Sequence, residues 1–318
     1  MKKKRNFWSL ACVSLGLLLC AESTPPRAQA APVRPPITSV SHLGVYAADM
    51  AKSDHFYTHD LGGVKRDDPE NPQGVRYYFN PLQFVEVLPL RAADAASTNR
   101  MDHMAYNTAD VKAMKRYLAA HGVKARGGIH KGSDGSQWFD VSDPEGNTVQ
   151  FVQPPKDPQP VADNPLSDHI IHFGFIVHDR ALEDTFYLKL LGFRPYWYGG
   201  KDAEKPAWIS AQLPDSTDWM EYMVVSGPEK QGIPATMSQA TAGVLNHFAL
   251  GVGNMEKTVT LLTDGGRISA KNDGPKIGAD GKWQFNMYDP DGTRAEFMEF
   301  HAVTKPCCSP FTATDPEK

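Results

Sequence analysis

Hydrophobic and polar positions recur along the chain in a unit of β-α-β-β-β type. Four apolar stretches rich in strand-forming residues each begin at a histidine (His42, His103, His172 and His247) and are followed by Asp or Asn seven positions on. Such a stretch predicts a β-strand. The Asp or Asn is a typical helix N-cap, because its side-chain oxygen accepts hydrogen bonds from free helix amides. Helical patterns ending at glycine follow (residues 50–61, 111–120, 181–191 and 255–262), and strand-like runs separated by turns complete each unit.

A longer repeat joins these units in pairs. Residues 128–147 match residues 274–293 at one constant offset, including a turn that reads Asp143-Pro-Glu-Gly in one copy and Asp289-Pro-Asp-Gly in the other. A proline-rich stretch between the copies is typical of an inter-domain linker. We therefore expect two domains of two units each, residues 38–155 and 167–301, with a linker over 156–166 and a tail over 302–318.

The N-terminus has the layout of a secretory signal peptide. Lys2 to Arg5 form a basic start, Phe7 to Ala21 are apolar, and Ala28-Gln-Ala30 is a small-residue cleavage site. The apolar run of about 15 residues is shorter than the roughly 20 that a bilayer-spanning helix needs. The sequence thus predicts a signal peptide over residues 1–30, cleavage after Ala30 and a periplasmic or secreted protein, with the export route left open.

Charge and cysteine content narrow the possible partners. The chain has 318 residues, enough for two domains, and a formal net charge of −4, which becomes −8 once the five basic residues and one acidic residue of the signal are removed. An acidic chain without blocks of Lys and Arg argues against nucleic acid or an anionic membrane as partner. Cys307 and Cys308 are the only cysteines that remain, and their role is left open. Two complete domains would let a monomer build a site, so a monomer or a homodimer is expected.

The strand-His-to-Asp frame, Phe56-Tyr57, the run Phe186-Tyr-Leu-Lys-Leu-Leu-Gly-Phe193 and the Asp-Pro-x-Gly turns together resemble the vicinal oxygen chelate superfamily (glyoxalase, bleomycin resistance protein and extradiol dioxygenase). The resemblance covers roughly residues 38 to 300. It implies an α+β fold in which four βαβββ units pair into two half-open β-cups. It also implies a small-molecule substrate and metal ligands from the first and last strands of each unit.

Carried over position by position, the resemblance implies two sets of candidate ligands. The second domain, which is the preferred site, offers His172, Glu221, His247 and Glu296. The first domain offers His42, Glu86, His103 and Gln150. In a four-ligand glyoxalase or epimerase layout, Glu221 and Glu296 would also serve as catalytic proton-transfer groups.

The residues support a cation at these positions independently. A strand alternates its faces, so Glu221 shares a face with Trp219 and Met223. A carboxylate that points into an apolar concavity is costly unless a charge compensates it, and a divalent ion held by imidazoles and carboxylates does so. Such a donor set suits Fe, Mn, Zn, Ni or Co, and the sequence does not choose among them.

Two classes of function follow. The first is a metal-dependent enzyme, either a glyoxalase- or epimerase-like lyase or isomerase or a dioxygenase, acting on a small oxygen-chelating substrate in the C-terminal cup. The alternative is a metal-free protein that binds or sequesters a small ligand. Metal content per chain distinguishes them. Residues 201–206 and 226–241 contain Gly, Pro and Ser, and are hypothesised to cover the cup.

Overall fold

The computed structural model describes residues 32–200, 204–225, 233–269, 272 and 274–317. The predicted signal peptide and parts of both hypothesised covering loops lie outside these residues. Residues from Pro32 onward form one compact unit. Within the described part of the chain, no helix has both the length and the apolar character needed to cross a membrane.

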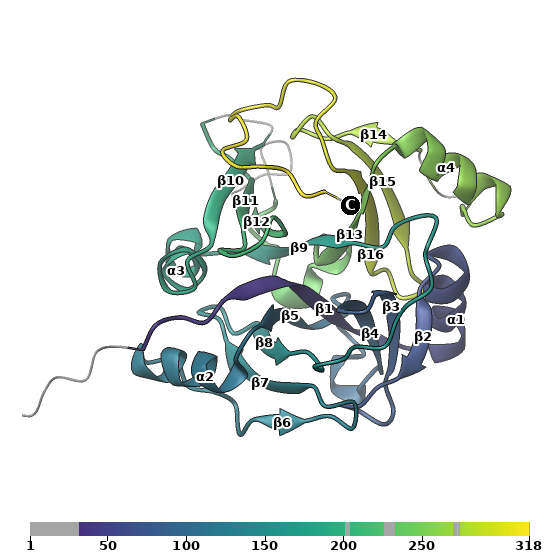
Figure 1. The fold of residues 1–318 in the computed structure, drawn as a ribbon. Helices are drawn as coiled ribbons and strands as arrows, with labels where there is room; N and C mark the ends of the chain where they lie inside the picture. The colour runs from purple at the N-terminus through teal and green to yellow at the C-terminus, as the bar shows by residue number, and fades with distance from the viewer. Residues whose placement is uncertain (1–31, 201–203, 226–232, 270–271, 273, 318) are drawn as a thin grey trace, which may run out of the picture. The chain divides into compact units, whose positions relative to one another are not determined.

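Within the described residues, sixteen strands form two eight-stranded sheets of identical topology, each curled into a half-open cup (Figure 1). The first sheet has the order β2-β3-β4-β1-β5-β8-β7-β6 and the second the order β10-β11-β12-β9-β13-β16-β15-β14. We call the concave faces of these sheets the first cup and the second cup. Each pair of expected units therefore builds one sheet, and the α+β fold of paired units is confirmed. The finer domain boundaries stay a prediction.

The strands of the first sheet are β1 (Ile37–Ala47), β2 (Val64–Asp67), β3 (Val75–Asn80), β4 (Gln83–Pro89), β5 (Met101–Thr108), β6 (His130–Lys131), β7 (Gln137–Ser142) and β8 (Thr148–Gln153). Those of the second are β9 (Ile170–Val177), β10 (Arg194–Gly199), β11 (Trp208–Gln212), β12 (Trp219–Val224), β13 (His247–Val252), β14 (Lys276–Ile277), β15 (Trp283–Tyr288) and β16 (Arg294–Glu299). Residues 154–169, which include the expected linker, contain no helix or strand.

The helices follow the first strand of each unit, as expected. They are α1 (Met50–His55), α2 (Val111–Ala120), α3 (Arg180–Asp184) and α4 (Met255–Asp264). The side chains of Asp49, Asp110, Asp179 and Asn254 accept hydrogen bonds from amides of the first turn, which confirms the predicted caps. The first and third helices differ from the sequence pattern, because their second halves are π-helical, η1 (Phe56–Asp60) and η3 (Thr185–Leu190). Short 3-10 turns are η2 (Ala92–Asp94), η4 (Gln239–Thr241) and η5 (Gly243–Leu245).

The Asp-Pro-x-Gly turns connect the two sheets. Asp291 accepts a hydrogen bond from the Ala48 amide (2.8 Å), at the end of β1 and just before α1. In the mirrored position Glu145 accepts from the His178 amide (2.6 Å), just before α3. Each turn thus docks on the first helix of the other sheet, and one hydrophobic cluster runs through both.

Candidate metal centres

Sheet register brings the first candidate centre together. His42 lies on β1, His103 on the antiparallel neighbour β5, and Glu86 on the parallel neighbour β4. Gly44 pairs with both Glu86 and His103, and a Cβ at Gly44 would lie 2.3 Å from the His103 ring. Gly174 has the same place beside His247, at 1.9 Å. The small residue in the repeated frame therefore makes room for the imidazole of the neighbouring unit.

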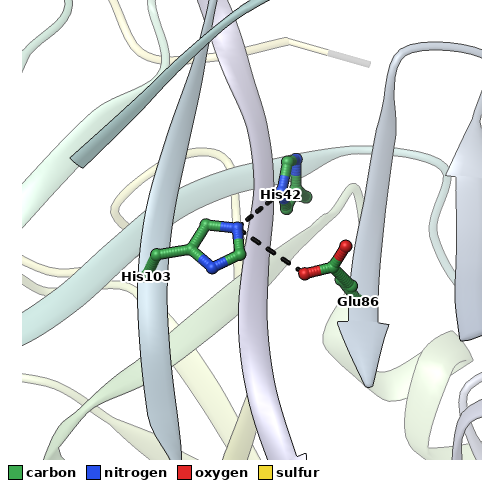
Figure 2. Close-up of side chains that lie close together, drawn as sticks. All are labelled: His42, Glu86 and His103. Carbon is green, nitrogen blue, oxygen red and sulfur yellow. Dashed lines mark hydrogen bonds and ion pairs between the residues drawn. The ribbon is translucent and has the colours of Figure 1, made fainter. Parts of the chain in front are cut away.

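The first centre has the geometry of a metal site (Figure 2). The Nε2 atoms of His42 and His103 are 2.8 Å apart, and Glu86 Oε2 lies 3.7 Å from His103 Nε2. An ion about 2.1 Å from two imidazole nitrogens at a right angle would hold them about 3 Å apart. His103 Nδ1 is bonded to Asp102 (2.9 Å) and His42 Nδ1 contacts the Ser41 hydroxyl (3.1 Å), which leaves both Nε2 atoms facing inward. Glu86 Oε1 is buried without a hydrogen-bond partner, so these residues fit a bound cation.

The first centre is short of positive charge. The buried guanidinium of Arg76 lies 2.7 Å from Glu70, 3.0 Å from Asp68 and 3.9 Å from Glu86. Burial, together with the charges of Glu70 and Asp68, raises the pKa of Glu86 well above its usual value despite the opposing charge of His103. Burial alone would lower the pKa of His103, but the bond to Asp102 and the charge of Glu86 raise it to about 9. Arg76 and His103 together face the carboxyl groups of Asp68, Glu70, Glu86 and Asp102, so the centre is short of positive charge when all four are ionised.

The second centre has the same layout with a different carboxylate. His172 on β9 and His247 on β13 have their Nε2 atoms 3.1 Å apart, and Glu296 Oε2 on β16 lies 3.6 and 3.4 Å from them. His247 Nδ1 donates to the Leu245 carbonyl (2.7 Å), and the His172 ring stacks on Trp219. Here the acid comes from the last strand of the even unit, whereas Glu86 comes from the odd unit.

A cation already lies in the second centre. Arg294 Nη2 is 2.8 Å from each ring nitrogen of His247. Burial would raise the pKa of Glu296, but the interaction with His247 and the charge of Arg294 hold it below its usual value. The pKa of His172 is lowered by burial and by the neighbouring His247, and that of His247 by burial and by Arg294. Arg294 was not predicted from the sequence, although its place two residues before Glu296 on one strand puts both side chains on the same face.

In each cup, the structure groups three of the four residues expected from the resemblance. Glu221 is not part of the second group, and burial and then the charge of Glu296 raise its pKa to about 8. The Gln150 amide donates to Glu70 (3.0 Å), and its Oε1 is buried without a partner. A third group of possible ligands, His55, His59 and Asp60, lies at the end of the first helix with both histidines exposed.

A cavity of about 580 Å³ opens in the first cup. Arg76, Tyr78 and Phe84 form part of its lining, and Phe84 stacks on His42 with ring centroids 4.3 Å apart. The rest of the lining comes from residues 65–69, 81–82, 133, 134, 136, 154, 155 and 157–159, with Ser41, Asn107 and Val152. Proline-rich residues of the expected linker therefore border this cavity, and the cavity lies next to the first centre.

Comparison with known proteins matches this architecture. The family model described as the glyoxalase/bleomycin resistance protein/dioxygenase superfamily matches residues 39–151 and 168–297, more than half of the chain. The search of curated proteins found no match.

Solved structures with the same fold include enzymes of two kinds. One is the Mn(II)-bound glyoxalase from Novosphingobium aromaticivorans (17% identity, 83% of each chain covered, TM-score 0.58). Another is the 2,3-dioxygenase LapB from Pseudomonas sp. KL28 (14%, 86% of this chain and 97% of that one, 0.60). A third is homoprotocatechuate 2,3-dioxygenase from Brevibacterium fuscum (18%, 88% and 86%, 0.59). At these identities the likeness concerns the fold.

Proposed function

Because this chain belongs to the glyoxalase/bleomycin resistance protein/dioxygenase superfamily, we propose that it is a metal-dependent enzyme that holds a divalent ion with His42, Glu86 and His103. The observation that carries the proposal is a pair of inward-facing Nε2 atoms 2.8 Å apart beside a buried carboxylate oxygen of Glu86 that has no hydrogen-bond partner. This places the working site in the first cup, whereas the resemblance favoured the second. The charge deficit and the adjacent cavity support the change.

The chain's own residues prepare the site for a small substrate. Asp102 fixes the orientation of the His103 ring, and Ser41 contacts the Nδ1 atom of His42. Phe84 and Arg76 form a flat wall, with the guanidinium 4.4 Å from the ring centroid. A divalent ion, when bound, supplies Lewis acidity to a substrate that chelates through neighbouring oxygens.

The cavity favours a substrate without a net negative charge. Its lining includes four carboxylates, Asp67, Asp68, Asp134 and Asp157, and three cations, Lys65, Arg66 and Arg76. Arg76 already contacts Asp68 and Glu70, and the Arg66 guanidinium donates to the Pro160 carbonyl. Lys65 is likewise paired, with Asp54 (2.8 Å). An anionic substrate would meet unfavourable charge here. We therefore expect neutral catechols or 2-oxoaldehydes to be preferred over acyl-CoA thioesters.

Two reaction types fit this site. A lyase or isomerase would use the carboxylates around the cavity to move a proton on the substrate. A dioxygenase is favoured by one specific observation, the donor set of two histidines and one carboxylate, which is common to non-haem Fe(II) oxygenases. Two assays distinguish these reaction types. A dioxygenase loaded with Fe(II) would consume oxygen on catechols, whereas a lyase or isomerase loaded with Mn(II) or Zn(II) would show proton exchange or isomer conversion by NMR.

Metal content tests the proposal as a whole. The full-length mature chain, incubated with Mn(II), Fe(II) or Zn(II) and desalted, is expected to retain metal that Glu86→Gln loses. The exposed Glu256→Gln serves as the matched control and is expected to retain it. If no ion is retained with any of the three metals, the enzyme proposal fails, and a metal-free binding protein becomes the better account.

We also propose that the protein acts outside the cytoplasm, on the strength of the basic and apolar start and the small residues before Ala31. N-terminal sequencing of protein recovered from a periplasmic or culture fraction is expected to begin at Ala31. Recovery of an intact Met1 start only in the cytoplasm would contradict export.

A further inference from the structure

The two centres differ at one structurally matched position. Arg294 on β16 pairs with His247, and Thr148 on β8 holds the same place opposite His103. The Thr148 hydroxyl accepts a hydrogen bond from Arg126 (2.7 Å) and adds no charge to the first centre. In the second centre the same position brings a guanidinium to 2.8 Å from His247. From this difference we propose that Arg294 takes the place of a metal ion in the second cup, so that only one of the two histidine pairs binds metal.

Coulomb repulsion gives the size of the effect. An ion about 2.1 Å from His247 Nε2 would lie no more than about 5 Å from Arg294 Nη2, since that nitrogen is 2.8 Å from Nε2. At an effective dielectric constant of about 20, repulsion between a divalent ion and a monovalent cation at this separation weakens metal binding by at least about 10⁵-fold. Glu296 already has this positive charge nearby, so the second centre lacks the charge deficit of the first.

The histidines of the second centre are otherwise arranged like those of the first, so Arg294 is the feature that distinguishes it. His247 Nδ1 donates to the Leu245 carbonyl, and its Nε2 lies 3.1 Å from His172 Nε2. His172 packs face to face on Trp219, with ring centroids 3.8 Å apart.

The chain's own C-terminal segment (residues 302–317) crosses the mouth of the second cup (Figure 1). On one edge of the sheet the Thr312 amide donates to Tyr196 of β10 (3.0 Å), and on the other the Cys307 amide donates to Ala279, between β14 and β15 (2.8 Å). Phe311 packs against Tyr196 inside the cup, with ring centroids 4.9 Å apart. Cys307 and Cys308 of this segment are joined by a disulfide.

A buried lysine anchors this segment. Lys282 Nζ donates to Asp315 (2.9 Å), to the Phe300 carbonyl (2.7 Å) and to the Tyr196 hydroxyl (3.1 Å). A strap of the same chain therefore packs against the second cup. The first cup has a cavity of about 580 Å³ next to its centre, so among the described residues the two cups differ in what lies over them.

Metal stoichiometry tests the inference, with Mn(II) as the probe and the full-length mature chain as the sample. The assignment of the first cup as the metal-loaded half rests on the proposed function. Wild type is expected to hold one equivalent, to keep it in Glu296→Gln and to lose it in Glu86→Gln. Arg294→Thr, which installs the residue of the first cup, is expected to gain a second equivalent, while Arg294→Lys is expected to hold one.

Each outcome either supports or overturns the inference. Two equivalents in wild type with one lost in Glu296→Gln would overturn the inference, and so would a folded Arg294→Thr that gains none. No metal in wild type but one equivalent in Arg294→Thr would support it while refuting the proposed function. If Arg294→Thr fails to fold, Glu296→Gln and the reciprocal Thr148→Arg still test the inference. Thr148→Arg is expected to lower the metal affinity of the first cup by at least about 10⁴-fold.

Discussion

Glu183 offers the sharpest test of how buried charge shapes the stability of this fold. The side chain lies in α3 and is fully buried; Oε1 accepts from the Glu145 amide (2.9 Å), and Oε2 is buried without a partner. Burial, together with the charge of Asp143, raises the pKa of its carboxyl to about 8 from an ordinary 4.5. In Glu183→Gln the amide oxygen can still accept from Glu145, and the titrating group is gone.

The sign follows from proton linkage. Between pH 4.5 and 8 the folded chain keeps the proton on Glu183 and the unfolded chain releases it, so stability falls as pH rises through this range. The loss is about 1.4 kcal/mol per pH unit, or up to about 3.5 kcal/mol from pH 5 to pH 8. Glu183→Gln is therefore expected to gain stability relative to wild type over this interval. At roughly 2–3 °C per kcal/mol for a chain of this size, the gain in Tm is about 7–10 °C.

Thermal unfolding of both proteins at pH 5, 6, 7 and 8 measures this difference. The exposed Glu256→Gln, in the first turn of α4, is the matched control. It is expected to show a small offset that does not change with pH above 6. A Glu183→Gln offset from wild type that is equal at pH 5 and pH 8 would show that the buried carboxyl is not held protonated, and the reasoning would be refuted.

Three further predictions concern the centres and the strap. Asp102→Asn is expected to weaken metal binding in the first cup about 10–100-fold, because the carboxylate orients the His103 ring. Competition with a chromophoric chelator measures the metal affinity, and an unchanged affinity would count against the assignment of His103 as a ligand. Because His103 has a pKa of about 9 without an ion, binding must displace a proton, so metal affinity should rise up to about tenfold per pH unit from pH 7 to 9. The pKa of Glu86 is also raised well above its usual value, so calorimetry in buffers of different ionisation enthalpy should show about one to two protons released, and none would contradict the prediction. Phe311→Ala should lower stability by about 2 kcal/mol, since the ring is partly buried, with the exposed Val303→Ala nearly neutral; equal Tm values for the two would argue against a packed strap.

Residues near in sequence explain why the fold could be predicted. Asp49, Asp110, Asp179 and Asn254 each cap a helix, because N-capping depends only on the next three amides. For the same reason, the repeated His-to-Asp frame predicts a strand followed by a capped helix in all four units. The sequence did not predict the π-helical second halves of the first and third helices. A π-helix differs from an α-helix in having i→i+5 backbone hydrogen bonds, and this difference leaves the apolar pattern intact.

The candidate ligands could be identified one by one, but not sorted into centres. Strand alternation places Glu86, Gln150, Glu221 and Glu296 on concave faces, and position alone made them equivalent. Only the folded sheets show that Glu86 and Glu296 approach histidine pairs, while Gln150 is bonded to Glu70. Which acid approaches a histidine pair depends on how far each side chain extends across the neighbouring strands. The periodicity of the sequence does not encode that distance.

The sequence by itself determined the four repeated units and the histidines on the opening strands, because these depend on local pattern and duplication. The resemblance to a known family added their pairing into two curled sheets. The tertiary structure alone decided which cup has a charge deficit and which is crossed by the C-terminal segment. Arg76, Glu70 and Asp68 meet around Glu86 from separate segments, and Arg294 meets His247 across two strands. The C-terminal segment reaches both edges of the second sheet. The charge balance of a centre and the access to a cup both depend on groups that are distant along the chain. Neither property exists until the chain has folded.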